Sequence, residues 1–488
     1  MLMKLRTALA ACLSLLSVVS AEERKPNVLL ILVDDLKPVL GAYGDPVAQT
    51  PNLDKFAASG MRFDKAYCNQ AVCAPSRYNY MLGSRSTSTG LYHLNQELRK
   101  FVPDAVTLPQ YFAKFGYSTQ SLGKTYHVGH GIHGDPQSWT VPPLRDQEVE
   151  YALKETTGGQ LTREEAYFNN IFDRPINDLP KGPAWEEADV PDEAYADGRV
   201  AAETIKRLEA AAQSDEPFLI AVGFARPHLP FTVPKKYWDL YDPKKLPMPK
   251  TSEFPQDSPP VAHKHGGEIA NYKPVPNNGL TDPDLTRQLI HGYYAATSYT
   301  DAQAGKVLDA LDRLKLSDNT IVILWGDHGF HLGDHGTWTK HTNYEQANRI
   351  PIIIRAPGVT QPGTSTEQLA QTVDIYPTAA ALAGLPAPEG PQPIDGHNLV
   401  PVLKDPKARI SDHVYHAFPH AVMGRAIRTD RYRMVEWKRS GAPESTAKYE
   451  LYDYERDPEE TQNLAAKKPK LLEKMKEILH QYPEAVIR

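Results

Sequence analysis

The stretch Asn27-Val28-Leu29-Leu30-Ile31-Leu32-Val33 is an uninterrupted run of mostly branched apolar residues that ends abruptly at Asp34-Asp35. A run of this length and composition is typical of a strand that is buried on both faces of a sheet. Two similar runs follow, at residues 218–222 and 320–325. We therefore predict that these three segments are strands of one buried sheet.

Amphipathic patterns typical of helices lie between these runs, at residues 196–212 and 298–314. The second pattern places Val307, Leu308 and Leu311 on one face. Strands that alternate with helices predict an α/β fold in which helices cover both faces of the sheet.

The pattern changes in the last part of the chain. Short alternating runs predict an antiparallel sheet with one wetted face, and they lie at residues 425–428, 432–437 and 449–452. Residues 465–480 predict a helix that closes this sheet. We expect residues 22–405 to form the main α/β domain and residues 406–488 a smaller C-terminal α+β subdomain. Within the main domain, residues 252–284 are rich in Pro, Asn, Gly and His and predict a long surface excursion.

The composition of the chain excludes several classes of protein. The chain has 488 residues, 41% of them hydrophobic, and a formal net charge of −6. These values are those of an ordinary globular protein and exclude collagen, coiled coils and wholesale disorder. Because the chain carries no excess of positive charge to neutralise phosphates, we expect no nucleic-acid partner.

The first residues have the features of a cleaved signal peptide. Lys4 and Arg6 precede an apolar run at residues 8–19, and small residues follow at Ser20-Ala21. We expect residues 1–21 to be removed by cleavage after Ala21. The run is too short to span a bilayer, and no other stretch is long and apolar enough, so we expect no membrane span. The mature protein is then predicted to be secreted or periplasmic.

Polar clusters follow each of the three predicted strands. Asp34-Asp35 follows the first, Arg226-Pro227-His228 the second and Gly326-Asp327-His328-Gly329 the third. In open α/β sheets, ligands bind beyond the carboxyl ends of the strands. Each cluster alone would suit a turn or a helix cap, but their expected convergence favours a binding site.

The acidic residues of these clusters suit a divalent cation. Asp34, Asp35 and Asp327 supply hard oxygen ligands of the kind that Ca²⁺ and Mg²⁺ prefer, and His328 supplies one more ligand. A histidine among the ligands keeps a transition metal open as an alternative.

Cysteine use is unusual for an exported chain, because only Cys68 and Cys73 remain after the signal peptide. A local disulfide between them is one interpretation. The residues around the second cysteine point elsewhere, because Cys73-Ala74-Pro75-Ser76-Arg77 resembles the motif of type I sulfatases, in which the cysteine is oxidised to formylglycine. Cys68 is then interpreted as a bystander.

Further blocks occur in the order that this family implies. They are Gly123-Lys124-Thr125-Tyr126-His127, Arg226-Pro227-His228-Leu229-Pro230-Phe231, Gly326-Asp327-His328-Gly329 with Lys340, and Leu451-Tyr452-Asp453 with Asp457-Pro458 and Glu460. The combination looks most similar to the iduronate-2-sulfatase group. The resemblance implies an alkaline-phosphatase-like fold, in which helices sandwich a central sheet. It also implies one Ca²⁺ ion, with Mg²⁺ as the alternative, and a formylglycine-generating enzyme that matures Cys73.

The same resemblance implies roles for single residues. The metal ligands are Asp34, Asp35, Cys73, Asp327 and His328. A hydrated aldehyde at position 73 attacks sulfur through one hydroxyl and releases sulfate when the second loses a proton, for which His127 is the expected base. We expect His228 to protonate the leaving oxygen. Lys124 and Lys340 are expected to hold the sulfate, and Arg77 to orient residue 73.

The substrate follows less directly. A 2-O-sulfated uronate of a glycosaminoglycan or of an algal polysaccharide such as ulvan is the expected substrate, and His93, His331 and Trp338 are candidate sugar contacts. The alternatives are a sulfatase for galactose, fucose or glucosamine sulfates, a phosphoester or phosphonate hydrolase, and a silent carbohydrate-binding relative. A phosphatase would more usually present Ser or Thr as nucleophile, and a silent relative should have lost one of these residues.

Overall fold

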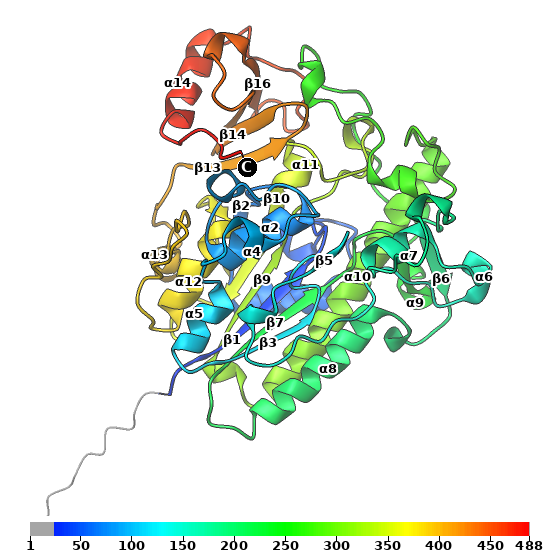
Figure 1. Cartoon of the computed structure of the whole chain (residues 1–488), viewed down its shortest axis with the longest axis vertical. Coiled ribbons are helices and arrows are strands. Elements are labelled where there is room, and N and C mark those ends of the chain that lie inside the picture. Colours follow the sequence, from blue (N-terminus) through cyan, green and yellow to red (C-terminus); the bar gives the residue numbers. More distant parts are fainter. Residues whose placement is uncertain (1–23, 488) are drawn as a thin grey trace, which may run out of the picture.

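The computed structural model describes residues 24–487 (Figure 1), so the predicted signal peptide lies outside the described residues. The spatial order of the main sheet is β11 (Thr364–Thr366), β2 (Met61–Tyr67), β10 (Arg349–Arg355), β9 (Thr320–Gly326), β1 (Asn27–Val33), β7 (Phe218–Phe224) and β3 (Ser118–Gly123), and β12 (Ala370–Gln371) also pairs with β2. The four neighbours β9, β1, β7 and β3 are mutually parallel, whereas β10 runs antiparallel to both β9 and β2. The three predicted strands are therefore adjacent, and their carboxyl ends share one edge of the sheet.

Strand β1 shows why the sheet is covered on both faces. Its side chains alternate between two apolar cores, with Val28, Leu30 and Leu32 in one and Leu29, Ile31 and Val33 in the other. The helices of the first core are α2 (Cys73–Leu82), α5 (Leu108–Lys114), α12 (Ile375–Leu382) and α13 (Val400–Lys404). The helices of the second core are α1 (Pro51–Ser59), α8 (Ala196–Ala211) and α10 (Pro283–Arg313). Figure 1 shows these two layers on opposite sides of the sheet, which confirms the predicted sandwich.

Helix α10 begins well before the predicted start at residue 298. Asp282 caps it through a hydrogen bond from the Leu285 amide to its side chain. Residues 289–301 are buried on every side of this helix, including Tyr293 and Ala295. A helix that is apolar all round shows no amphipathic stripe, so its first half could not be recognised from periodicity.

The remaining parts of the main domain are short elements and loops. They include α3 (Ser86–Thr89), α4 (Leu98–Phe101), β4 (Val128–Gly129), β5 (Ile132–His133), α6 (Lys154–Thr157), α7 (Arg163–Phe168), β6 (Trp185–Ala188), β8 (Phe231–Pro234), α9 (Lys235–Trp238) and α11 (Glu345–Asn348). The predicted excursion at residues 252–284 contains only short 3₁₀ turns, among them η7 (Glu268–Asn271), until α10 begins at Pro283. This excursion is anchored by Ile269 and Tyr272, which are fully buried in a third apolar cluster.

The C-terminal part forms its own antiparallel sheet, in the order β13 (His413–Pro419), β14 (Met423–Thr429), β15 (Tyr432–Lys438) and β16 (Lys448–Asp453), with α14 (Pro469–Leu479) packed against it. It contacts the main domain through ion pairs such as Arg428 with Glu345. The sheet and helix confirm the predicted antiparallel subdomain, whereas its boundary at residue 406 stays a prediction.

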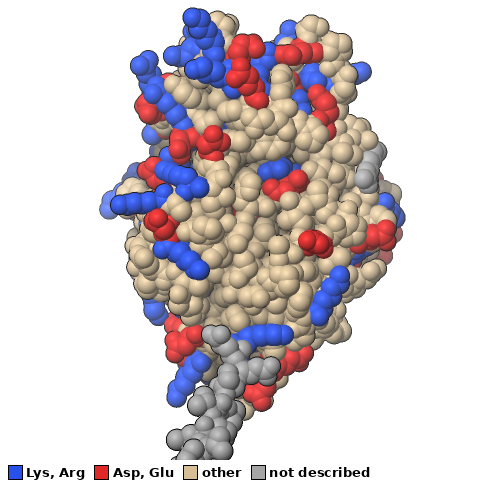
Figure 2. Space-filling view, turned by 90° about the vertical axis from the view of Figure 1, so that its left-hand side faces the viewer, with Lys and Arg blue, Asp and Glu red and all other residues tan. Residues whose placement is uncertain are grey.

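On the face shown in Figure 2, acidic and basic side chains are interspersed rather than gathered by sign. Among residues 24–487, no helix is long and apolar enough to cross a membrane.

Candidate active site

The carboxyl ends of four adjacent parallel strands carry the predicted site residues. Asp34 and Asp35 follow β1, and Asp327 and His328 follow β9. Lys124 follows β3, and the loop after β7 carries His228. The arrangement is the one expected for a ligand site at the edge of an open α/β sheet.

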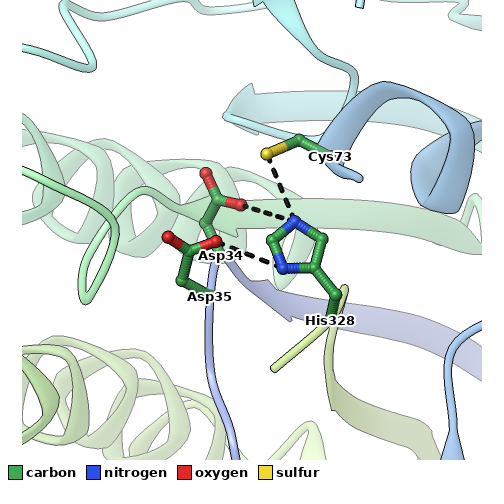
Figure 3. A group of neighbouring side chains, drawn as sticks. All are labelled: Asp34, Asp35, Cys73 and His328. Atoms are coloured by element: carbon green, nitrogen blue, oxygen red, sulfur yellow. Dashed lines mark hydrogen bonds and ion pairs between the residues drawn. The ribbon is translucent and has the colours of Figure 1, made fainter. Parts of the chain in front are cut away.

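Asp34, Asp35, Cys73 and His328 form a compact buried cluster (Figure 3). One ligating atom from each lies within 4.8 Å of all the others. Nε2 of His328 lies 3.2 Å from the Cys73 Sγ and 3.9 Å from an Asp34 oxygen. The backbone carbonyl of Gly329 lies 3.0 Å from His328 Nδ1, so a proton on Nδ1 leaves the Nε2 lone pair directed into the cluster. Burial lowers the pKa of His328 to about 4, so the ring is neutral at neutral pH, as a metal ligand requires.

Asp327 completes the acidic group from one side. One of its oxygens accepts hydrogen bonds from the backbone amides of Asp35, at 3.1 Å, and His328, at 2.8 Å. The other oxygen pairs with the Arg77 guanidinium at 2.8 Å. Burial and the neighbouring Asp34 carboxylate raise the pKa of Asp327 to about 8, because the carboxylates repel one another out of water.

These residues fit a divalent cation. The ligating atoms of two buried carboxylates, one imidazole and the Cys73 sulfur converge, and the Asp327 carboxylate lies beside them, 3.6 Å from His328 Nε2. A hard cation that takes oxygen ligands would offset the repulsion between these carboxylates. The positive φ of 58° at Asp35 is consistent with a binding site, because strained backbone is retained where the surrounding structure enforces it.

Helix α2 places Cys73 in this cluster. All ten of its residues are buried, and Cys73 is its first residue. Ser76 donates a hydrogen bond to the Asp327 carbonyl at 2.5 Å, and Arg77 donates to the Lys124 carbonyl and pairs with Asp34 at 3.3 Å. Residues 73, 76 and 77 therefore share the helix face that meets the strand ends. The N-terminus of α2 favours negative charge at position 73.

The thiol itself is poorly suited to act as a nucleophile. Burial and the Asp34 carboxylate raise the pKa of Cys73 well above its ordinary value. Reactive cysteines show the opposite shift. Cys68 is also free and fully buried, and its Sγ lies near the Ala347 carbonyl and the Asn348 side chain.

Two buried lysines flank the cluster, and each lies between two carboxylates. Lys124 Nζ lies 2.6 Å from Asp34 and 2.7 Å from Glu148. Lys340 Nζ lies 3.4 Å from Asp35 and 2.5 Å from Glu268. Burial alone would lower the pKa of each lysine, but the paired carboxylates raise it, so both ammonium groups keep their charge.

Two histidines face the same space from different loops. Burial and the nearby Lys124 ammonium lower the pKa of His127 well below its ordinary value, so this ring is neutral and able to accept a proton. Its Nε2 lies 3.1 Å from Nδ1 of His130. His228 Nδ1 lies 2.5 Å from the Leu229 carbonyl, and its Nε2 lies 3.2 Å from Glu268.

A cavity of about 360 Å³ opens above these groups. It is lined by Cys73, Leu94, His127, His130, Glu164, Phe168, His228, Lys264, His265, Gly267, Glu268, Ala270, Asn271, Asn277, Lys340 and His341. Four of the predicted residues line this cavity: Cys73, His127, His228 and Lys340. Asp34, Asp35 and His328 cluster with Cys73. The structure also adds two acids, Glu268 in the cavity lining and Glu148 beside Lys124. Sequence reasoning missed both acids because neither follows a predicted strand or belongs to a recognised motif.

The predicted sugar contacts lie elsewhere. His331 is fully buried and its Nε2 lies 2.9 Å from the Thr342 hydroxyl. Trp338 is buried in the third apolar cluster and its indole donates to Thr281 at 3.3 Å. The His93 side chain is exposed, and the cavity lining includes its neighbour Leu94 instead. His331 and Trp338 therefore contact other parts of the protein, and neither lines the cavity.

Comparisons with known proteins show the family of the chain. The family model described as sulfatase matches residues 26–385, and the model described as N-sulphoglucosamine sulphohydrolase, C-terminal, matches residues 333–485. Iduronate 2-sulfatase of Mus musculus is 34% identical over 511 residues, which cover 90% of this chain and 90% of that protein.

Solved structures share the fold. A structure in complex with its substrate D-glucosamine-2-N,6-O-disulfate has a TM-score of 0.72 at 20% identity and covers 94% of this chain and 97% of that chain. A phosphonate monoester hydrolase of Agrobacterium radiobacter has a TM-score of 0.72 at 21% identity, and the match covers 94% of this chain and 95% of that chain. The match of the sulfatase model to most of the chain, together with the iduronate 2-sulfatase similarity, shows that this protein belongs to the sulfatase family and is a sulfuric ester hydrolase.

Proposed function

We propose that this sulfatase removes sulfate from a 2-O-sulfated uronate in a sulfated saccharide, with a formylglycine at position 73 and a Ca²⁺ ion held by Asp34, Asp35, Asp327, His328 and residue 73. The observation that carries the proposal is the cluster in which Cys73, whose thiol does not ionise readily, lies at the N-terminus of α2 beside Asp34, Asp35 and His328. Similarity to iduronate 2-sulfatase supports the choice of sugar.

A divalent cation held by these residues, together with formylglycine at position 73, would supply the nucleophile, because the cation would lower the pKa of a hydroxyl of the hydrated aldehyde. The protein's own residues do the rest. Lys124 and Lys340 offer fixed positive charge to the sulfate oxygens without reorganisation during the reaction. Arg77 holds Asp34 and Asp327 in place and so orients the cluster below the nucleophile.

Protons move at the two cavity histidines. His127 is neutral and buried, so it can accept the proton whose loss accompanies sulfate release. His228 lines the cavity with its Nε2 beside Glu268, and we assign it the donation of a proton to the leaving sugar oxygen. Arg226 fixes the loop that carries this ring by donating to the His228 carbonyl at 3.0 Å and the Glu148 carbonyl at 3.1 Å.

The test of the proposed function is a substrate panel. Ca²⁺-loaded protein, produced together with a formylglycine-generating enzyme, is assayed for sulfate release from 2-O-sulfated uronates and from sulfated galactose, fucose and glucosamine. We expect release from the 2-O-sulfated uronates. Release confined to another sugar would contradict the proposed substrate, and release from none of them would contradict the function.

The role of His228 predicts a dependence on the leaving group. In the His228→Asn protein, we expect kcat for the sugar sulfate to fall by about 10²- to 10⁴-fold, because the sugar oxygen needs a proton to leave. Hydrolysis of 4-nitrophenyl sulfate should fall much less, because nitrophenolate leaves without one. Equal losses on both substrates would contradict the assignment of His228 as the acid.

We also propose that the protein is exported, on the basis of residues 1–21 of the sequence. A formylglycine-generating enzyme in the producing cell is then the partner required for maturation, and sulfated oligo- or polysaccharides outside the cytoplasm are the source of substrate.

A further inference from the structure

Glu268 is held in the cavity by a backbone arrangement that leaves it little freedom. Gly266 and Gly267 precede it with φ of 60° and 109°, and a Cβ on Gly267 would lie 2.6 Å from the Thr339 Cβ. The Gly266 carbonyl accepts a hydrogen bond from the Trp338 amide at 2.9 Å, and Ile269 is fully buried. The segment that carries Glu268 is therefore paired with the segment that leads to Lys340.

The Glu268 carboxylate lies between two groups that the proposed reaction requires: Lys340, which binds the sulfate group, and His228, which protonates the leaving oxygen. One oxygen lies 2.5 Å from Lys340 Nζ and the other lies 3.2 Å from His228 Nε2. All three side chains line the cavity above residue 73. Burial alone would raise the pKa of Glu268, but the Lys340 ammonium and His228 hold it well below its usual range, so the side chain is ionised.

A second metal ion is not the best explanation for this acid. Asp35, His228 and Glu268 do offer three ligating atoms within 4.8 Å of one another. However, the Lys340 ammonium lies between the two carboxylates, at 3.4 Å from Asp35 and 2.5 Å from Glu268, and already supplies the cation there.

A carboxylate that is held beside an anion-binding site distinguishes between anions by their charge. Its repulsion acts on any anion that approaches Lys340 and His228, and it grows in proportion to the charge of that anion. A sulfate ester carries one negative charge on its sulfate group, whereas the sulfate ion and a phosphate monoester at neutral pH carry close to two. Because the backbone of Glu268 is anchored, its carboxylate stays close to any anion that enters the space between Lys340 and His228.

We propose that Glu268 is a specificity-determining residue that makes the site prefer the singly charged sulfate group of an ester over doubly charged anions, namely the released sulfate ion and phosphate monoesters. This inference rests on the proposed function, because it assigns the sulfate position to the space between Lys340 and His228. Repulsion of the unwanted anion is a common way to achieve specificity.

The test compares two anions that share a head group and differ in charge. Binding of inorganic sulfate and of methyl sulfate is measured by isothermal titration calorimetry at low salt, on Ca²⁺-loaded protein with unmodified Cys73, so that no turnover is needed. In the Glu268→Gln protein, we expect the affinity for sulfate to rise about tenfold more than the affinity for methyl sulfate. Glu268→Asp keeps the charge and should keep the original preference.

The matched control is Glu455→Gln, which removes one negative charge from an exposed residue paired with Arg431 on the C-terminal subdomain. It should leave the ratio of the two affinities unchanged. Equal changes for both anions in Glu268→Gln, a loss of affinity for both, or no measurable binding of either to this variant would each overturn the proposal.

A second measurement uses the mature enzyme. The ratio of kcat/KM for phenyl sulfate to that for phenyl phosphate should fall about tenfold in Glu268→Gln, and an unchanged ratio would contradict the proposal. If the wild-type enzyme released no sulfate from any ester, the proposed function would fail, whereas the calorimetric ratio would still decide whether Glu268 selects by charge.

Discussion

Replacement of Cys73 by alanine should abolish sulfate release by the mature enzyme, with a fall in kcat of about 10⁵-fold or more. The expected loss is this large because we propose that position 73 supplies the attacking atom. The other described residues that line the cavity offer no substitute, because they are histidines, lysines, acids, amides and apolar residues. Sulfate release is measured by ion chromatography on the substrate of the panel that the wild-type enzyme prefers.

Cys68 provides the matched control for this change. It is the same residue type, five positions earlier and equally buried, but the cavity lining does not include it. Cys68→Ala should retain kcat and lose at most some stability. Substantial sulfate release by Cys73→Ala, with a melting temperature near that of the wild type, would contradict the assignment of position 73 as the nucleophile.

The sequence was most informative where parallel strands end. Asp34, Asp327 and His228 each follow a long apolar run, and the carboxyl ends of parallel strands meet at one sheet edge, so their convergence could be predicted without coordinates. The position of Cys73 at this sheet edge could be inferred only from the family resemblance. Cys73 lies on a short helix whose apolar pattern does not indicate where the helix packs.

The acidic partners of the lysines could not be predicted in the same way. Glu148 lies in an irregular segment and Glu268 begins the short 3₁₀ turn η7, and the positions of both depend on how distant loops pack. The Gly266-Gly267 pair was the only local signal, because consecutive glycines mark a backbone that must take unusual φ values. Trp338 and His331 were predicted to contact the sugar because they lie next to a motif. Both are buried, so they support the site by packing and do not form its surface.

Removal of the divalent cation should have the second largest effect. Chelation by EDTA should lower sulfate release by about 10³-fold or more, because a bound cation contributes several kcal/mol of charge stabilisation. Addition of Ca²⁺ should restore release. The same cation should raise the melting temperature, since a ligand at 100 times its Kd stabilises the folded state by about 3 kcal/mol. Mg²⁺ in place of Ca²⁺ tests which ion the site prefers.

Asp35→Asn separates the two effects of the cation. Without metal, Asp34, Asp35 and Asp327 lie close together in a buried site, where Arg77 and Lys124 pair with Asp34 and Asp327. Lys340 lies 3.4 Å from Asp35, but burial still raises the pKa of Asp35, so the ionised form of this side chain is disfavoured. Loss of one carboxylate should therefore raise the melting temperature of the metal-free protein, because less repulsion remains. The variant should nevertheless lose sulfate release and the response of its melting temperature to Ca²⁺. An exposed acid changed in the same way, Asp215→Asn, should keep both. Wild-type activity that survives exhaustive chelation, or an Asp35→Asn protein that still responds to Ca²⁺, would show that the cluster does not hold the catalytic ion.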